Sequence, residues 1–405
     1  MSLLRRAAEQ RVFRPFGDSS IPTNGSLMAP TASGMAVNEQ TAMQLTAVWA
    51  CVRIISTTLA SLPLSAMTDR GGIQVPASPQ PVIVADPFGG EGGGARFPSR
   101  RVGIKQIATS LLLRGDGYGM VTARDYLARP TRAQVIHPDR VNVELDDEGG
   151  RTYEVDRKPV PTEDMIHLTA MCMPGSPTGM SPIAYARQSI GLGLAAEKFG
   201  AGFFGQGAHM SGVITVPGDL DKGKARQMKE AFEASHSGLS NAHAIGVLSG
   251  GADWKSISVT PEDAQFLGTR AAQNLDIAML YGVPPHMLGQ VDRTTSWGTG
   301  IEQQSIGFLT YTLADWVGIF EDAWSAMLPR TQRARFDTTE LQRTDTTGRY
   351  AGYVQARTAG LLTQNEIRAK ENMPPVPGGD DPNAPLNSAH SGDTGGAAPA
   401  PEEEP

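Results

Sequence analysis

Apolar side chains recur at helical spacing in five long stretches of the chain. When an apolar residue returns every three or four positions, those side chains share one face of a helix and pack against a core. The helices predicted on this ground span 38–62, 102–113, 182–205, 262–282 and 301–328. In the first helix the residues expected in the core are Leu45, Val48, Val52, Ile55, Leu59 and Leu62.

Residues that favour helix ends mark the boundaries of these stretches. Asn38 is a suitable N-cap for the first helix, because its side chain can accept a hydrogen bond from a backbone amide of the first turn. Pro63 stops that helix. The pair Ser181 and Pro182 opens the third helix. Proline is tolerated there because the backbone amide that it lacks would have no partner within the helix. Gly282 and the two prolines after it end the fourth helix.

The fourth and fifth helices hold a polar loop between them. The face that the fourth helix is expected to bury consists of Phe266, Leu267, Leu275, Ile277, Ala278 and Leu280. The fifth helix carries a near-regular stripe of Ile306, Leu309, Leu313, Val317, Phe320 and Trp324. The segment QVDRTTSWGTG between them has no apolar period and is rich in turn-forming residues. A polar loop between two strongly specified helices is suited to contact a partner.

Short β-rich segments and three shorter helices complete the pattern. The predicted strands, bounded by turn-forming residues, are 118–123, 134–137, 141–145, 153–155, 165–168, 211–216, 244–248, 254–259 and 335–341. The shorter helices are a charged one over 221–235, one over 345–359, and one over 364–371 with Asn365 at its start. Residues 69–99 are rich in Gly and Pro and are predicted to form an extended loop. The fold class is therefore α+β, with strands inserted between long helices.

Composition limits the classes of partner. The chain has 405 residues, which suffices for two or three domains, and its net charge is −7. This charge argues against a broad basic face that grips nucleic acid, although it allows a polyanion to slide past. Only two cysteines occur, which excludes a disulfide framework and a Cys-rich zinc site. No apolar run approaches the length of a membrane span, so no membrane partner is expected.

The sequence offers no complete active site, and no cofactor is expected. Residues 191–196, GLGLAA, match a dinucleotide-binding fingerprint but lie inside a helical pattern with no strand before them. Small residues that allow close helix packing are the favoured interpretation of this motif. The GGEGGG run at 89–94 lacks the Lys-Ser or Lys-Thr of a phosphate-binding loop. The histidines His209, His236 and His243 lack metal-ligand spacing, so no metal site is predicted.

Two charged clusters were weighed as binding sites. The acidic cluster of Glu144, Asp146, Asp147 and Glu148 has the ligand types of a divalent cation site, but a hydrated hairpin turn is the favoured interpretation. A basic stripe in an otherwise acidic chain consists of Lys222, Lys224, Arg226 and Lys229. The favoured interpretation is a solvated helix face, and the alternative is a contact surface for nucleic acid or an acidic partner.

Four motifs, in this order, resemble those of portal proteins of long-tailed double-stranded DNA phages. The first is TAVWACVRIISTTLASLPLSAM at 46–67, and the second joins GVI at 212–214 to DAQF at 263–266. The third is YGVPPHMLG at 281–289, followed by EQQ at 302–304. The fourth is GLLTQNEIR at 360–368, followed by PPVPGGD at 374–380. The resemblance covers about residues 38–382.

The resemblance implies a portal fold: an α/β wing, a two-helix stem, a small α/β clip and a short helical crown. Transferred by position, it divides the chain into a flexible N-terminal arm (1–37), wing (38–182), stem helix (183–208), clip (209–261), stem helix (262–283), tunnel loop (284–300), wing (301–344), crown (345–375) and disordered tail (376–405). Family members form a ring, usually of twelve subunits, around a channel at one capsid vertex. No enzymatic activity is expected of such a chain.

The resemblance also implies partners and contact residues. The expected partners are other copies of the chain, the large terminase subunit, a head–tail adaptor, the major capsid protein and scaffold, and double-stranded DNA bound without sequence preference. The location is the virion, with assembly in the host cytoplasm. The residues that would face DNA in the tunnel loop are Gln290, Val291, Asp292, Arg293, Thr294, Thr295, Ser296, Trp297, Gly298, Thr299 and Gly300. The terminase contact in the clip would use Lys222, Lys224, Arg226 and Lys229.

Within the expected tunnel loop Trp297 departs from the small polar residues around it. Two roles remain open for this side chain: a wedge against DNA, or an anchor on a neighbouring subunit, of which the anchor is favoured. Two other functions were considered for the chain as a whole. One is a head–tail adaptor or minor capsid protein, and the other is a nucleotide-binding enzyme built on the glycine-rich segments.

Overall fold

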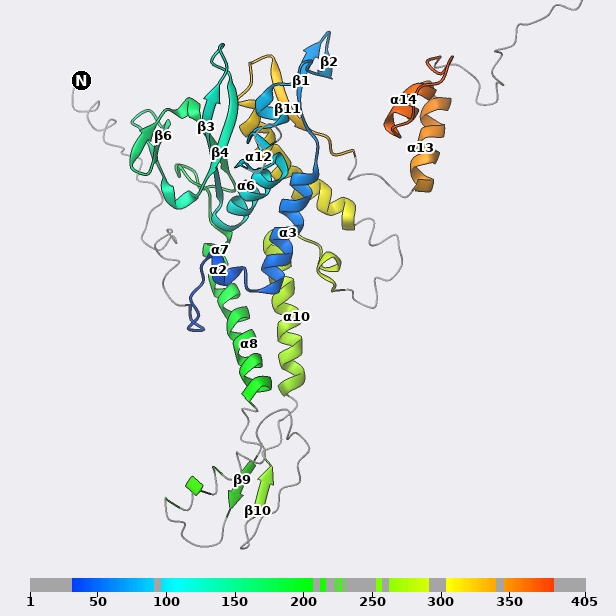
Figure 1. The fold of residues 1–405 in the computed structure, drawn as a ribbon. Helices are drawn as coiled ribbons and strands as arrows, with labels where there is room; N and C mark the ends of the chain where they lie inside the picture. Colours follow the sequence, from blue (N-terminus) through cyan, green and yellow to red (C-terminus); the bar gives the residue numbers. More distant parts are fainter. Residues whose placement is uncertain are drawn as a thin grey trace, which may run out of the picture. The chain divides into compact units, whose positions relative to one another are not determined.

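The structure is a computed structural model of the 405-residue chain (Figure 1). It describes residues 31–90, 96–206, 212–215, 253–256, 262–290, 304–339 and 346–381, together with positions 223, 226, 227 and 230. The chain divides into two compact units, residues 1–337 and 338–405, and each is described separately. Helices and small sheets alternate along the chain, which confirms the predicted α+β class.

The first predicted helix is two helices, α2 (Glu39–Ala42) and α3 (Thr46–Ser61). Asn38 caps α2 as predicted, because its side chain accepts a hydrogen bond from the Thr41 amide. The prediction of one continuous helix was wrong at Leu45, whose backbone is extended (φ −72°, ψ 117°). Leu45 is only 3% exposed and packs against α8 (Arg187–Gln206), so tertiary packing overrides local helix propensity there.

Helix α3 is the centre of the larger unit and packs against α6 (Arg100–Arg114). All six residues predicted for its core face are at most 3% exposed, from Leu45 to Leu62. Ser99 caps the start of α6, and Gly115, with φ +81°, ends it. The predicted helix over 102–113 is therefore confirmed and is slightly longer than expected.

A sheet that the sequence did not predict joins distant parts of the chain. Its strand order is β11-β1-β2, and its members are β1 (Leu64–Arg70), β2 (Ile73–Pro76) and β11 (Gln332–Phe336). The prediction of an extended loop over 69–99 was wrong, since β1, β2 and the short helix α4 (Val82–Ala85) occupy part of it. Leu64 pairs with Phe336, so partners far apart in sequence fix this sheet. The strand predicted at 335–341 corresponds to β11, which begins and ends earlier than predicted.

Two antiparallel sheets form the β-rich block that the sequence predicted. The first, in the order β4-β3-β8, contains β3 (Asp116–Arg124), β4 (Pro130–Ile136) and β8 (Met165–Thr169). The second, in the order β5-β6-β7, contains β5 (Val141–Leu145), β6 (Arg151–Val155) and β7 (Lys158–Val160). Short 3₁₀ turns, η3 (Pro138–Arg140) and η4 (Thr162–Asp164), connect them. Strand β7 was not predicted, because three residues are too few for a recognisable alternation.

A buried polar network ties these sheets to the segment that leads into the long helices. Asp116, 6% exposed, accepts hydrogen bonds from the Gly179 amide at 2.9 and 3.0 Å. His167 Nε2 lies 2.9 Å from the same carboxylate, and His167 Nδ1 lies 3.2 Å from the Tyr153 hydroxyl. The His167 ring also stacks on Tyr118. These contacts satisfy the hydrogen bonds of buried polar groups. They also hold Gly179, two residues before the helical stretch that begins at Ser181.

The fifth predicted helix contains a π-helical segment that periodicity did not reveal. Residues Phe308–Leu313 form η7, with π-helical hydrogen bonds, and Ala314–Ser325 continue as α12. Four residues of the predicted stripe are buried: Leu313, Val317, Phe320 and Trp324. Ile306 is 54% exposed, so its assignment to the core was wrong. The π segment adds a residue to the turn and rotates the helix face that precedes it.

The smaller unit contains α13 (Thr346–Thr358) and α14 (Gln364–Lys370). The prediction that Asn365 starts α14 was wrong. Thr363 is the N-cap and forms a capping box with Glu366. The Asn365 side chain instead bonds the amide and carbonyl of Val376 at 2.8 and 3.0 Å, and so fastens the proline-rich segment after the helix.

Candidate functional site

The two long helices of the larger unit, α8 and α10 (Glu262–Tyr281), lie side by side (Figure 1). The side chain of Gln273 donates hydrogen bonds to the carbonyl and hydroxyl oxygens of Ser189, both at 2.8 Å. Arg270 forms an ion pair with Glu197 at 3.4 Å. Ser189 and the later residue Glu197 of α8 thus contact Gln273 and the earlier residue Arg270 of α10, so the two helices are antiparallel. The predicted helix over 262–282 is confirmed, and the stretch over 182–205 is confirmed as α7 (Pro182–Tyr185) followed by α8.

The glycines of the GLGLAA motif serve close packing, as the sequence analysis favoured. A Cβ atom on Gly191 would lie 2.5 Å from the Thr31 hydroxyl oxygen. A Cβ on Gly193 would lie 3.1 Å from Leu45 and 3.3 Å from Gln273. The motif therefore brings three segments into contact at the top of the helix pair. It lies within a helix and does not follow a strand, as a dinucleotide-binding turn requires.

The buried face of α10 is narrower than predicted. Ile277 and Ala278 are each 1% exposed, as expected. Leu275 and Leu280 are 41% and 37% exposed, so their assignment to the core was wrong. Gln273, a polar residue at 7% exposure, occupies the contact with α8 instead. A buried glutamine is tolerated there because its amide is hydrogen-bonded to Ser189.

The end of α10 is fixed by a residue from the π-helical segment. Gly282 adopts φ +65°, a conformation that favours glycine. A Cβ atom at this position would lie 2.6 Å from the Thr312 hydroxyl oxygen. That hydroxyl donates a 2.7 Å hydrogen bond to the Gly282 carbonyl oxygen. The π segment thus supplies the contact that joins the end of α10 to the helix after the loop.

Both ends of the segment 291–303 are held by side-chain hydrogen bonds. His286, in the turn η6 (Pro285–Leu288), has Nδ1 2.8 Å from Gln304 Oε1, which requires the proton on Nδ1. Gln290 Nε2 donates to the carbonyl oxygen of Ala271 in α10 at 3.3 Å. The residue before the segment is therefore bonded to the long helix, and the residue after it is bonded to the turn that follows that helix. No sequence motif indicated the contact between His286 and Gln304.

A buried thiol and phenol lie where α3 meets the end of α10. Cys51 is fully buried, and burial raises the pKa of its thiol to about 12. Burial, with the neighbouring Cys51 as a smaller cause, raises the pKa of the Tyr281 phenol above its usual range. Both groups are therefore neutral in the folded protein at pH values where an unfolded chain would ionise them.

We expect the free energy of unfolding to fall as pH rises from about 9 toward 12. Above the ordinary thiol pKa, the unfolded chain releases a proton that folded Cys51 keeps, which favours unfolding. Cys51→Ala should make this decline shallower by up to about 1.4 kcal/mol per pH unit, the value for one proton. The measurement is chemical unfolding at pH 8, 9, 10 and 11. Cys172→Ala, at an exposed thiol, is the matched control and should leave the slope unchanged.

Most of the site residues predicted from the sequence lie outside the described residues. Of the DNA-facing residues expected in the tunnel loop, Gln290 is described and 291–300 are not. Of the basic stripe, Arg226 is described, and it is exposed and helical, whereas Lys222, Lys224 and Lys229 are not described. Both assignments therefore stay predictions.

The described part of the chain also lacks two other kinds of site. No group of three or more His, Cys, Asp or Glu side chains within it is arranged to hold a metal ion. None of its helices combines the length and the hydropathy needed to cross a membrane.

The antiparallel pair α8–α10, the helix after it and the surrounding small sheets define a portal-type α+β fold. A portal structure of the HK97 family from Corynebacterium diphtheriae has a TM-score of 0.55 and 17% identity, covering 74% of this chain and 94% of that one. The neck of a native gene transfer agent particle, computed with C12 symmetry, gives a TM-score of 0.55 at 21% identity, covering 83% of this chain and 92% of that one. At these identities the similarity establishes the fold alone.

The chain belongs to the phage portal protein family, whose model matches residues 46–372. It is 32% identical to the probable portal protein of Streptomyces phage phiC31 over 92% of this chain and 83% of that protein. It is 28% identical to the portal protein of Enterobacteria phage HK97 over 89% of this chain and 87% of that protein. The family and the portal function predicted from the four motifs are confirmed, in preference to an adaptor.

Proposed function

We propose that the chain is the subunit of a closed ring at one vertex of a virion, through whose channel double-stranded DNA is packaged and ejected. The observation that carries the proposal is the family match over 46–372, which includes both helices of the antiparallel pair. The structural neighbour computed with C12 symmetry supports a ring of twelve. The large terminase subunit, a head–tail adaptor and the major capsid protein with its scaffold are the proposed partners.

The proposed division of the subunit follows the elements of the fold. Helices α8 and α10 are proposed as the stem, residues 209–261 between them as the clip, and residues 38–182 with 301–344 as the wing. Residues 345–375, which include α13 and α14, are proposed as the crown. The clip is proposed to contact terminase during packaging through Lys222, Lys224, Arg226 and Lys229.

Electrostatics supports passage of DNA rather than tight binding. A ring of twelve subunits, each of charge −7, carries a net charge on the order of −80. Such a ring repels phosphates on average, which lowers friction on a moving duplex. Among the proposed DNA-facing residues of the tunnel loop, 290–300, Asp292 and Arg293 are the only charged ones, so contacts there are weak and brief.

Measuring the mass of the purified protein tests the proposed ring. Sedimentation velocity should show one main species of about 520 kDa, which is twelve times the chain mass of 43.0 kDa. A neighbouring ring size would keep the proposal and change only the subunit number. A protein that stays monomeric over a wide range of concentration and salt would contradict it.

A further inference from the structure

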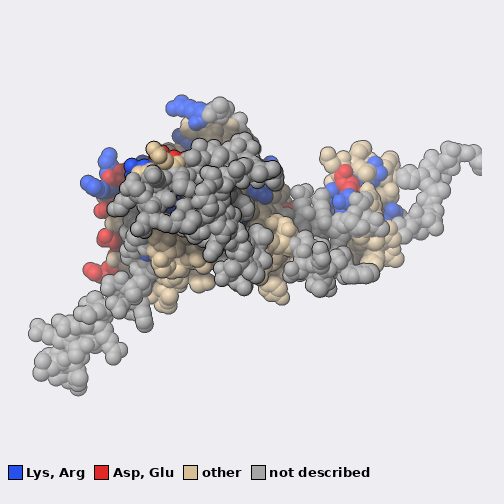
Figure 2. All heavy atoms as spheres, turned by 90° about the horizontal axis from the view of Figure 1, so that it is seen from below, with Lys and Arg blue, Asp and Glu red and all other residues tan. Residues whose placement is uncertain are grey.

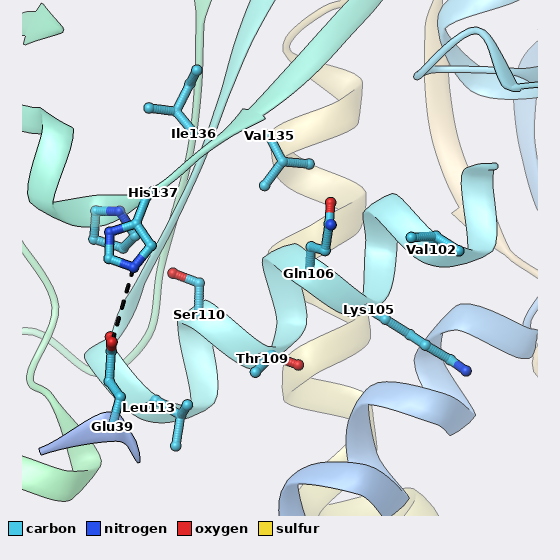
Figure 3. A pocket seen from close by; sticks show the side chains of 11 residues that line it. Glu39, Val102, Lys105, Gln106, Thr109, Ser110, Leu113, Val135, Ile136 and His137 are labelled. Carbon is cyan, nitrogen blue, oxygen red and sulfur yellow. Dashed lines mark ion pairs between the residues drawn. The ribbon is translucent and has the colours of Figure 1, made fainter. Parts of the chain in front are cut away.

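A cleft of about 520 Å³ lies between α6 and the β4–η3 segment (Figure 3). Its walls are largely apolar, with Val102 and Leu113 from α6 and Val135 and Ile136 from β4. Val102 is 45% exposed, which is unusual for a valine on a helix packed in a core. Lys105, one turn after Val102, lines the same cleft. The cleft is therefore an apolar slot with a cation beside it.

The main helix of the cleft, α6, is basic. Helix α6, which forms one wall, carries four basic side chains and no acidic one, whereas α2 contributes the single carboxylate of Glu39. Arg114 is occupied, because it forms ion pairs with Glu39 and Asp139 at one end of the cleft. This pairing offsets the charge of the Glu39 carboxylate that lines the cleft. Three cations of α6 without an ion pair among the described residues remain: Arg100, Arg101 and Lys105.

A projecting hairpin of the same subunit has the opposite character. The hairpin formed by β5 and β6 carries five acidic side chains and a single basic one, Arg151. Its tip, residues 144–150, is exposed throughout, and acidic side chains gather along this edge of the larger unit (Figure 2). Leu145, 40% exposed, lies among the carboxylates of Glu144 and Asp146. The tip is thus an apolar side chain surrounded by negative charge.

The hairpin tip is preorganised for contact. Asp146 Oδ1 accepts hydrogen bonds from the amides of Glu148 and Gly150 at 3.0 and 2.6 Å. The backbone closes the turn with a bond from the Asp146 amide to the Gly150 carbonyl oxygen. Among the described residues, none of the four tip carboxylates forms an ion pair with a cation of its own subunit. A rigid loop with unpaired charges loses little conformational entropy when it binds.

We infer that the β5–β6 hairpin tip of one subunit binds the α6 cleft of the next, with Leu145 in the apolar slot and the tip carboxylates beside Lys105 and Arg101. An apolar side chain meets an apolar slot and the charges of the tip and of α6 have opposite signs, so the occupant is a second copy of the chain. Since the interface joins subunits of the proposed ring, it depends on that ring.

The tip does not occupy the cleft of its own subunit. Strand β5 begins at Val141, three residues after Pro138 in the cleft wall, and extends from there. At the rise of a β-strand, Leu145 lies roughly 13 Å along β5 from its start. The hairpin's base, rather than its tip, therefore adjoins its own cleft. Two different surfaces on each subunit form a head-to-tail contact, the kind that closes a ring when the rotation allows.

Disulfide trapping tests the contact directly. In a Cys172→Ser background, the double variant Val102→Cys with Leu145→Cys should give a ladder of covalent oligomers on a non-reducing denaturing gel after oxidation. Each single variant should remain monomeric on that gel, because the contact joins two different surfaces. Leu145→Cys with Ile73→Cys, at a 67% exposed position on β2, is the matched control pair and should give no ladder.

Sedimentation of the same samples separates failure of the contact from failure of the ring. If the double variant sediments as a ring but gives no ladder, the hairpin contact is wrong and the ring stands. If the unmodified chain forms no ring, the proposed function itself fails. Dimers from a single-cysteine variant would overturn the contact in favour of a symmetric one.

A charge exchange provides the second test. Lys105→Glu and Asp147→Lys should each raise the concentration at which half the protein is assembled by at least about tenfold, because like charges placed opposite each other weaken an interface. The double variant should recover most of this loss, since the pair is restored with the signs exchanged. If the double variant assembles no better than the single variants, the proposed contact is wrong. A Lys105→Glu variant that assembles normally but binds a DNA duplex more weakly would assign the basic face to nucleic acid instead.

Discussion

Deleting Thr294–Gly298 should leave the ring intact and reduce the yield of DNA-filled particles to background. The reason lies in how the ends of this segment are held. His286 bonds Gln304, and Gln290 bonds Ala271, so the flanking residues keep their positions without the middle of the loop. Eight residues remain between Gln290 and Gln304 after the deletion, and they span up to about 26 Å when extended. The shortened loop therefore connects the two helices without strain on their packing.

The deletion is tested in a packaging assay with particles assembled from otherwise unmodified components. Ring formation is checked by sedimentation of the variant, and DNA content by nuclease protection. Deletion of Gly395–Pro399, also five residues, is the matched control and should package normally. If particles built with the Thr294–Gly298 deletion fill normally with DNA, the assignment of this loop to the DNA channel is contradicted.

Trp324→Ala should lower the free energy of unfolding by about 3–5 kcal/mol, the range for removing a large aromatic side chain from a core. Trp324 is fully buried in α12. Its ring stacks on Phe320 and meets the edge of Phe88, and its Nε1 donates a 3.2 Å hydrogen bond to the Ile83 carbonyl oxygen. The substitution removes a contact between segments about 240 residues apart and leaves a buried acceptor without its donor.

Chemical unfolding of the full chain, followed by far-ultraviolet circular dichroism, measures this loss. Trp49→Ala is the matched control, because Trp49 is 53% exposed on the outer side of α3. Its effect should stay within about 0.5 kcal/mol, as for most surface substitutions. Equal losses for the two tryptophans would contradict the placement of Trp324 in the core.

Features set by local sequence were predicted from the chain alone. The six core residues of the first helical stretch and the cap at Asn38 follow from spacing and from short-range hydrogen bonding. The small residues of GLGLAA were correctly interpreted as packing positions, because a dinucleotide-binding turn needs a strand before it. Family membership followed from four motifs in order, each weak by itself.

Features set by distant partners were not predictable in this way. Strand β1 directly follows a helix and has no clear alternation of its own, and it becomes a strand because β11 pairs with it from the far end of the chain. The extended backbone at Leu45 results from packing against Gly193 of α8. Asn365 has the chemistry of an N-cap but bonds Val376, because Thr363 already occupies the capping position.

The helices on either side of the polar loop were predicted, whereas the contacts that hold the ends of the loop were not. The polar loop between two helices followed from the loss of apolar periodicity after Gly289. The contacts that hold its ends depend on tertiary placement and, for Thr312, on a π-helical turn that rotates the chain. A single extra residue per turn changes which side chain faces Gly282, and hydrophobic spacing does not report it.

Electron cryo-microscopy of the purified assembly tests the central claim most directly. The account predicts a closed ring in which α8 and α10 of every subunit surround a central channel and the segment between Gln290 and Gln304 faces that channel. A map in which this segment lies on the outer surface of the ring, or particles that form no ring, would contradict it.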